Sequence, residues 1–183
     1  MIRTKEELKA LFAAGEIQTE QMMIDLIDSC FNNGRHEIGV FAALQGEAVT
    51  SIGTINQYEY IRGTFSNTPM EEFSFVEIDG EPYIKYIGEE PYYFEIDAHS
   101  TLKASVNGTT VCGAIKKNGT IVDESVMSVY IKTGGEPFNF SGTSVVMLET
   151  DDTIQMVTKA DKVSNITFIN LTATIRPFID VTA

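Results

Sequence analysis

The feature that most constrains the fold is a two-residue alternation from Phe94 to Val106. The even positions are apolar (Phe94, Ile96, Ala98, Leu102, Ala104 and Val106), whereas the odd positions between them are polar or charged, and only Ser100 breaks the pattern. A period of two indicates a β-strand with one buried face, because a helix repeats every 3.6 residues. The same alternation returns from Ile169 to Arg176. The chain is therefore predicted to form antiparallel sheets with one buried and one solvated face.

Turn signals separate these apolar segments. Asn118-Gly119 is the strongest of them, because a type I′ turn needs positive φ at both central residues. Asp79-Gly80 predicts another hairpin, with a loop extending to Pro82. Residues 148–154 (Leu-Glu-Thr-Asp-Asp-Thr-Ile) predict a third. Short strands at regular spacing, with turn residues between them, are typical of a sandwich or jelly roll.

Two short amphipathic helices are predicted before the β region. Thr4 with Glu7 forms a capping box, and Thr19 is a second N-cap. Helices this short cannot form a core alone, so their apolar stripes either cap the sandwich or dock on another chain. The residues predicted to dock are Leu8, Leu11, Phe12, Met23, Leu26, Ile27 and Phe31. The predicted fold is mainly β: an antiparallel jelly-roll sandwich over residues 36–183, preceded by two short α-helices in an anchoring segment, residues 1–35.

Composition narrows the classes of function. The net charge of −13 argues against nucleic-acid binding, which depends on Lys and Arg neutralising phosphates. The opening residues show no secretory signal, and no apolar run approaches membrane-spanning length, so no membrane partner is expected. The two cysteines, Cys30 and Cys112, are interpreted as small buried hydrophobic residues and not as a disulfide.

Catalytic patterns are absent from the sequence. His36 and His99 lie far apart, and no nucleophile–base spacing, phosphate loop or His/Cys metal spacing is visible, so the chain is predicted not to be an enzyme and to need no cofactor. Acidic clusters are interpreted as solvated turns. The alternative is a Ca²⁺ site in an acidic loop, with Asp151 and Asp152 as the first pair to test.

Several segments in this order resemble a known family. They are residues 93–96 (Tyr-Phe-Glu-Ile), residues 115–120 (Ile-Lys-Lys-Asn-Gly-Thr), residues 145–156 and the alternating last strand. Together, from Ile87 to Ile175, they are similar to jelly-roll heads of the tumour-necrosis-factor-like and complement-globular-head superfamily, in the version used by virion proteins of bacteriophages and large viruses. One departure is Asp151, where the family usually has Gly or Asn. Aspartate tolerates the left-handed conformation, so the turn is expected to survive.

The resemblance implies a homotrimer whose protomers pack through aromatic and aliphatic residues of one sheet. Tyrosine suits such an interface because its ring is apolar and its hydroxyl is polar. Each aromatic residue could equally be an ordinary half-buried strand residue, since strands favour aromatics. The wider set also includes Tyr58, Tyr60 and Tyr83, and the residues predicted for the trimer interface are Tyr86, Tyr92, Tyr93, Tyr130, Phe138 and Phe140.

The function expected from the resemblance is that of a non-enzymatic virion component. It would be a trimeric head fibre, decoration protein or appendage that attaches to capsid, neck or tail proteins through its N-terminal helices and displays the β head. It would be made in the host cytoplasm and located in the virion. The alternative is a receptor-binding tip that recognises a host-surface glycan or protein. A surface hydrolase is a third hypothesis, but it needs an acid/base pair that the sequence does not reveal.

Overall fold

The computed structural model describes residues 39–66 and 72–178, without the side chains of residues 39–42. These residues belong to one compact unit of the chain, Glu37–Ala183. The two predicted N-terminal helices, their seven docking residues, His36 and Cys30 lie outside the described residues, so the predictions about them stay predictions. In the described ranges, no helix has the length and apolar character needed to cross a membrane.

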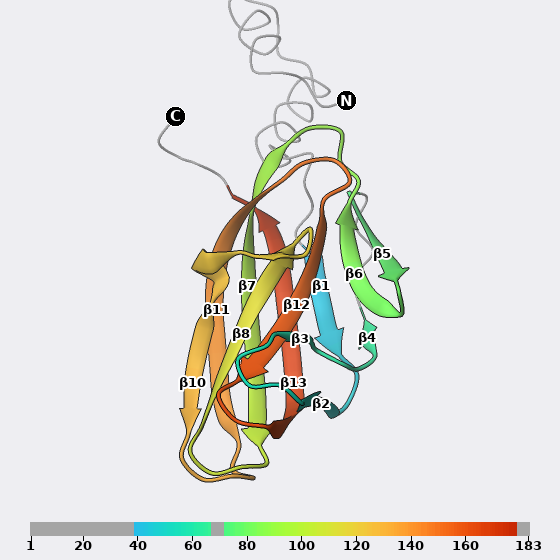
Figure 1. The fold of residues 1–183 in the computed structure, drawn as a ribbon. Coiled ribbons are helices and arrows are strands. Elements are labelled where there is room, and N and C mark those ends of the chain that lie inside the picture. The colour runs from blue at the N-terminus through green and yellow to red at the C-terminus, as the bar shows by residue number, and fades with distance from the viewer. Residues whose placement is uncertain (1–38, 67–71, 179–183) are drawn as a thin grey trace, which may run out of the picture. The chain divides into compact units, whose positions relative to one another are not determined.

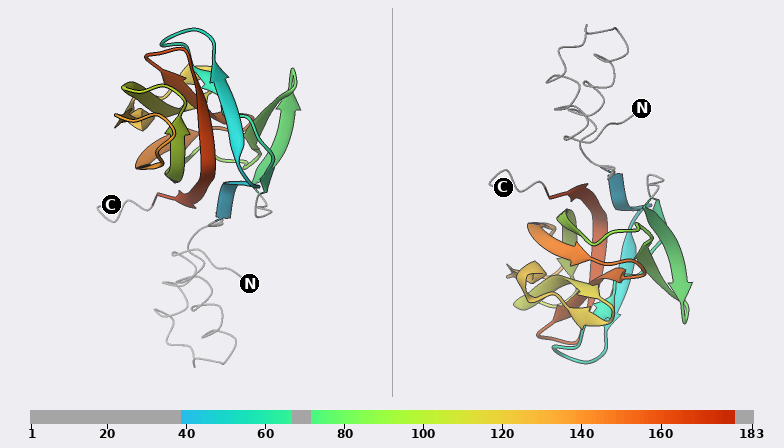
Figure 2. Two further views of the ribbon diagram at one scale, coloured as in Figure 1. Left: turned by 90° about the horizontal axis from the view of Figure 1, so that it is seen from below. Right: turned by 90° about the horizontal axis from the view of Figure 1, so that it is seen from above.

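The described residues form two antiparallel sheets (Figures 1 and 2). In the first sheet the order is β11 (Phe138–Leu148), β7 (Tyr92–Ala104), β13 (Ser164–Pro177), β1 (Gly39–Leu44) and β4 (Phe65–Ser66), while β2 (Ala48–Ile52) also pairs with β13. In the second the order is β10 (Met127–Ile131), β8 (Thr109–Lys117), β12 (Thr153–Ala160), β6 (Glu81–Tyr86) and β5 (Phe73–Ile78); β3 (Glu59–Tyr60) pairs with β12 and β9 (Thr120–Ile121) pairs with β8. A single 3-10 turn, η1 (Asp123–Ser125), precedes β10.

Strand β7 confirms the predicted alternation. Phe94, Ile96 and Leu102 are at most 1% exposed and point between the sheets, whereas His99 is exposed on the outer face. The strand pairs with β11 on one side and with β13 on the other over nearly its whole length. The backbone N–H and C=O groups on both edges of β7 therefore have partner strands. The side chains on one face of the strand contribute to the core.

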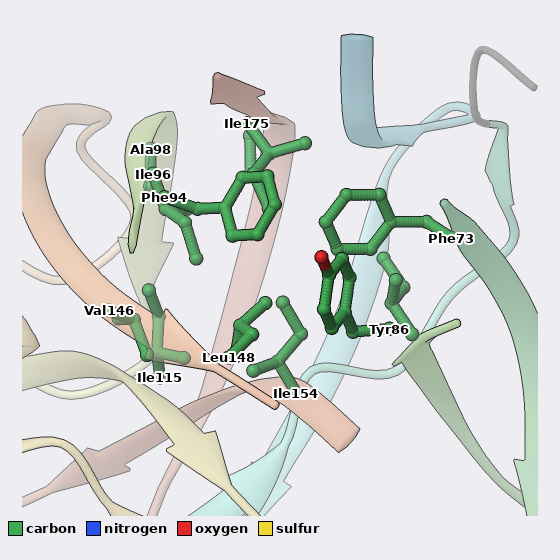
Figure 3. Packing of buried hydrophobic residues seen from close by; sticks show 12 residues of the cluster. Phe73, Tyr86, Phe94, Ile96, Ala98, Ile115, Val146, Leu148, Ile154 and Ile175 are labelled. Carbon is green, nitrogen blue, oxygen red and sulfur yellow. The ribbon is translucent and has the colours of Figure 1, made fainter. Parts of the chain in front are cut away.

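The core between the sheets contains an aromatic group at one end (Figure 3). Phe73, Tyr86 and Phe94 have ring centroids 5.2–5.3 Å apart at tilted or edge-on angles. Such pairs contribute about 0.5–1.5 kcal/mol beyond the burial of their surface. Aliphatic residues from both sheets, including Ile154 and Ile175, surround the rings. A second cluster, around Leu102, Ile166 and Phe168, fills the other end of the sandwich.

Two of the predicted hairpin turns are confirmed. Asn118 and Gly119 have φ of 50° and 79° and join β8 to β9. Asp79 and Gly80, with φ of 54° and 79°, join β5 to β6. The prediction that this loop extends to Pro82 is wrong, because Pro82 lies inside β6 opposite Glu77. The proline is tolerated there because β12 pairs with β6 only at Ile84 and Lys85, so no ladder hydrogen bond to β12 is lost at Pro82.

The third predicted hairpin, residues 148–154, is wrong. The chain does turn sharply there, with Asp151 at φ 74° and the Asp152 N–H donating to the Glu149 carbonyl at 2.9 Å. However, β11 before the turn belongs to the first sheet and β12 after it belongs to the second. The segment is a crossover between the two sheets. Turn residues indicate where a chain reverses, but they do not determine which strands then pair.

Candidate functional site

Exposed apolar side chains gather on the outer face of the first sheet. Tyr93 on β7 lies directly opposite Met147 on β11, and Val145 follows two residues earlier on the same face of β11. Phe178, just after β13, donates its N–H to the Tyr93 carbonyl at 2.8 Å. These side chains are 37–54% exposed. We call Tyr93, Val145, Met147 and Phe178 the outer patch.

The charged residues beside the outer patch form ion pairs with one another. Arg176 on β13 forms an ion pair with Glu95 and contacts Asp97 at 3.2 Å, both on β7. The Thr143 hydroxyl on β11 also donates to Asp97. Two carboxylates thus share one guanidinium and one hydroxyl across three adjacent strands. The two carboxylates and the one guanidinium leave a net charge of −1 beside the patch, whereas the chain as a whole carries −13.

The six predicted interface aromatics do not share one surface. Tyr93 lies on the outer patch, and Tyr92 is half-buried with its ring edge-on to Phe94 at 5.5 Å. Tyr130 is 61% exposed but belongs to β10, in the other sheet. Phe138 and Phe140 are half-buried and pack on the second core cluster.

Tyr86 is the clear correction among them, because it is fully buried and offers no surface to another protomer. Along a strand, alternate side chains point to opposite faces of the sheet. The abundance of aromatic residues does not tell which of the two faces each one occupies.

Asp152 and Asn118 lock two turns together at one end of the sandwich. The Asp152 carboxylate accepts from the Asn118 amide at 2.6 Å and from the Glu149 N–H at 2.8 Å, and it pairs with Lys117 at 2.7 Å. The Asn118 side-chain oxygen accepts from the Thr153 N–H at 2.8 Å. We call this set the turn clamp. It joins the β8–β9 hairpin of the second sheet to the crossover that arrives from the first.

These contacts determine the direction in which the pKa of the Asp152 carboxyl group is shifted. Burial alone would raise the pKa of this carboxyl group. The hydrogen bonds from the Glu149 backbone, Lys117 and Asn118, together with the Lys117 charge, outweigh burial and hold the pKa below its ordinary value. The clamp is therefore built for the ionised carboxylate.

The structure also shows what binds Asp151 and Asp152, the acidic pair that was the alternative Ca²⁺ site. Asp151 pairs with Lys85 at 2.7 Å, whereas Asp152 is bound within the clamp. Each carboxylate thus has its own lysine, and the two do not present a common set of free oxygens. In residues 39–66 and 72–178 no group of three or more His, Cys, Asp or Glu side chains could hold a metal ion.

Tyr86 ties the buried aromatic group to the same end. Its hydroxyl donates to the Glu90 carbonyl at 2.8 Å, and its backbone N–H donates to the Asp152 carbonyl at 2.8 Å. Burial, with smaller effects from Glu72 and Glu90, raises the pKa of Tyr86 to about 12. A Cβ on Gly88 would lie 2.2 Å from the Tyr86 hydroxyl oxygen, so only glycine fits beside this ring.

Cys112 differs from its sequence interpretation. It is half-buried and free, and its neighbour across the strand pair is Lys159 on β12. Burial raises the pKa of its thiol. The expectation of a buried hydrophobic cysteine is wrong, because Cys112 occupies the outward position between the inward Val111 and Gly113.

Comparison with known proteins gives the fold. No protein-family model matches the sequence, and no curated protein matches it. Among solved structures, the Eiger tumour necrosis factor of S. frugiperda superposes with a TM-score of 0.53 at 6% identity, covering 81% of this chain and 98% of that one. The fold is similar to that of a tumour necrosis factor.

Two further structures match over similar lengths. Murine APRIL has a TM-score of 0.48 at 9% identity, covering 78% of this chain and 99% of that one. The globular domain of the zebrafish complement 1qA protein has a TM-score of 0.43 at 12% identity, covering 76% of this chain and 97% of that one. The predicted jelly-roll architecture is confirmed by the first match together with the two-sheet topology.

Proposed function

We propose that the chain is a non-enzymatic β head that self-associates as a homotrimer through the outer face of its first sheet. The observation that carries the proposal is the outer patch, where four large apolar side chains from three neighbouring chain segments are exposed together. On soluble proteins, large contiguous apolar patches are uncommon and often mark an interaction site. The number three comes from the resemblance to the trimeric heads; the patch supplies the surface.

The surroundings of the patch fit an interface. Charged residues are depleted from the centres of protein interfaces because unpaired charges are costly to desolvate. Here the nearest charges, Glu95, Asp97 and Arg176, form one ion-paired group whose net charge is −1. Beyond them the face continues as His99, Ser141 and Thr172, which can exchange hydrogen bonds with a second copy. An apolar end and a hydrogen-bonding end together specify one orientation between protomers.

The biological part of the proposal is a role in a virion. The chain would be a head fibre, decoration protein or appendage of a bacteriophage, attached to capsid, neck or tail through residues 1–35 and displaying the β head outward. This placement is supported by the order of motifs from Ile87 to Ile175. The net charge of −13 would keep heads crowded on a particle from adhering to one another.

Mass measurement in solution tests the assembly. The wild-type chain is expected at three times its 20.2 kDa by sedimentation or light scattering at micromolar concentration. Met147→Lys, which places three like charges at the interface, is expected to give monomers with unchanged monomer stability. Val163→Lys is the matched control, because Val163 is 62% exposed outside the patch. A wild-type monomer, or a Met147→Lys trimer, would contradict the proposal.

Attachment is tested separately by deleting residues 1–35. The truncated chain is expected to remain a folded β head and to lose its association with particles. Continued association would show that the head itself carries the attachment surface. The neighbouring genes give an independent check, since structural genes of a virus are usually grouped, and a neighbourhood without viral genes would count against the virion role.

A further inference from the structure

The tripeptide Asn-Gly-Thr occurs twice in the chain, at residues 107–109 and 118–120. Asparagine followed by glycine is prone to deamidation, because glycine has no side chain to shield its backbone nitrogen from the asparagine carboxamide. In both copies the glycine has a positive φ, 62° at Gly108 and 79° at Gly119. The three residues are identical, so a difference in reactivity between the copies would reflect the fold.

The fold opposes deamidation at Asn107. The Gly108 N–H donates to the Lys132 carbonyl at 3.1 Å, so the nitrogen that would attack is engaged. The Asn107 side-chain oxygen accepts from the Gly134 N–H at 2.6 Å, which holds the carboxamide in place. The position over Gly108 is also crowded, because a Cβ there would lie 3.2 Å from the Tyr130 hydroxyl oxygen. A succinimide ring at this copy has neither a free nucleophile nor room to form.

The glycine of the second copy lacks these restraints. Within the described residues the Gly119 N–H has no hydrogen-bond acceptor, because the hairpin ladder resumes at Thr120 opposite Lys117. In the part of the chain that the structure describes, nothing lies within 4 Å of a Cβ placed on Gly119. Asn118 and Gly119 are both exposed. The nucleophilic nitrogen and the space for a ring are therefore both available.

The turn clamp restrains the second copy through the Asn118 carboxamide. The NH₂ group donates to Asp152 at 2.6 Å, and the oxygen accepts from the Thr153 N–H at 2.8 Å. Deamidation removes this NH₂ group, so its bond to Asp152 must open for the reaction to proceed. The acceptor is a carboxylate paired with Lys117 at 2.7 Å, and such charge-assisted bonds are strong. Opening of the clamp therefore controls the rate at Asn118.

We propose that Asn118 is a site of spontaneous deamidation, and that the reaction dismantles the turn clamp. The Gly119 nitrogen forms a bond to the side-chain carbonyl carbon of Asn118, and the side-chain nitrogen leaves as ammonia with the proton of the Gly119 N–H. Water then opens the succinimide ring at either carbonyl carbon and leaves aspartate or isoaspartate. A carboxylate now faces Asp152 in place of an N–H donor, and the two like charges repel each other.

Incubation of the full-length chain in mildly alkaline buffer, followed by tryptic peptide mapping, tests the site. Trypsin separates the two copies because Lys116 and Lys117 lie between them, and mass spectrometry records the conversion of each amide to a carboxylate. In the folded chain Asn118 is expected to convert at least about tenfold faster than Asn107. In concentrated urea, where both copies are unfolded, the two rates are expected to be similar.

Three variants test the control by the clamp. Asp152→Asn weakens the hold on the Asn118 carboxamide and is expected to speed its conversion about tenfold. Lys117→Gln is a milder change that keeps the Asp152 carboxylate, and a smaller effect in the same direction is expected. Lys85→Gln is the matched control, because Lys85 pairs with the neighbouring Asp151 outside the clamp, and its rate is expected to equal that of the wild type.

The Asn107 peptide reports unfolding of the head in each sample. Equal rates at Asn107 and Asn118 in the folded wild type, or a stable Asn118, would overturn the inference. Equal acceleration of both copies by Asp152→Asn would assign the effect to unfolding and overturn the control by the clamp.

Stability measurements test the consequence of the reaction. The aged wild type and Asn118→Asp are both expected to unfold at a lower urea concentration than the fresh wild type. Unchanged midpoints in both would show that the clamp survives the modification, and that part of the inference would be wrong.

Discussion

The two ends of the sandwich use lysine differently. At the clamp end, Asp152 and Lys117 satisfy each other together with Asn118. At the opposite end, which we call the Gly108 end, the Lys162 ammonium donates to the Asn107 carbonyl at 2.8 Å and forms no ion pair within the described residues. Both ends consist of tight turns with residues at positive φ. The difference is therefore not in backbone geometry but in whether a lysine faces a carboxylate.

This difference bears on stability. A largely buried carboxylate that accepts several charge-assisted hydrogen bonds contributes to folding, whereas an exposed lysine that donates to one carbonyl contributes little. Substitutions at the clamp end should therefore lower the free energy of unfolding more than substitutions at the Gly108 end.

The largest expected effect is that of Gly88→Ala at the clamp end. The new methyl group would overlap the Tyr86 ring, which Phe73 and Phe94 hold in place. Overpacking of this kind is expected to lower the free energy of unfolding by about 3 kcal/mol, measured by urea denaturation. An unchanged midpoint would show that this end is more adaptable than its contacts indicate.

The next effect is that of Asp152→Asn, about 2 kcal/mol at pH 7, because the charge-assisted hydrogen-bond network loses its negative charge and one of its two acceptor oxygens. The pKa of Asp152 is lowered in the folded protein, so the carboxylate stabilises the fold above the unfolded-state pKa of about 4. That stabilisation disappears as the pH falls through the folded-state pKa. The difference between variant and wild type should therefore shrink below about pH 4, and a difference constant down to pH 2 would contradict the role of the charge.

Tyr86→Phe has a smaller expected cost, about 1 kcal/mol at pH 7, for the hydrogen bond to the Glu90 carbonyl. Its pH dependence has the opposite sign. Because the pKa of Tyr86 is raised to about 12, the neutral hydroxyl stabilises the fold below the unfolded-state value of about 10. This stability is lost as the pH rises toward 12. The variant should resist alkaline unfolding better than the wild type, which circular dichroism can follow.

The smallest effect is expected for Lys162→Gln at the Gly108 end, within about 0.5 kcal/mol, as for most surface substitutions. The same thermal and urea measurements apply. A loss comparable to that of Asp152→Asn would remove the distinction between the two ends, because it would show that Lys162 acts mainly in folding.

Local patterns predicted the strands and most turns. The alternation around Phe94 holds because one face of β7 is buried along its whole length. Asn118-Gly119 holds because its conformation is a property of the two residues themselves. By contrast, Leu148 and Thr153 were assigned to one hairpin although they belong to different sheets, and sheet membership depends on pairing with distant strands.

The candidate surfaces could be predicted less well than the strands. Tyr93 was recognised, but its partners Val145, Met147 and Phe178 carry no motif and become a patch only through strand register. The Gly108 end brings together Gly108, Tyr130 and Lys162, which are far apart in the sequence. Tyr130 was selected as an interface aromatic, whereas its hydroxyl is the group that meets the glycine. Only the folded chain shows that these three residues converge.

The position of β13 has a consequence for biosynthesis. This strand lies between β7 and β1 and also pairs with β2. Without it, β1 and β2 are not joined to β7. Strands β1 and β2 can therefore pair with β13 only after residue 177 has left the ribosome. Until then their unpaired edges are exposed to other nascent chains. We expect the head to acquire its structure after translation of this region is finished, with molecular chaperones shielding the incomplete sheet in the interval.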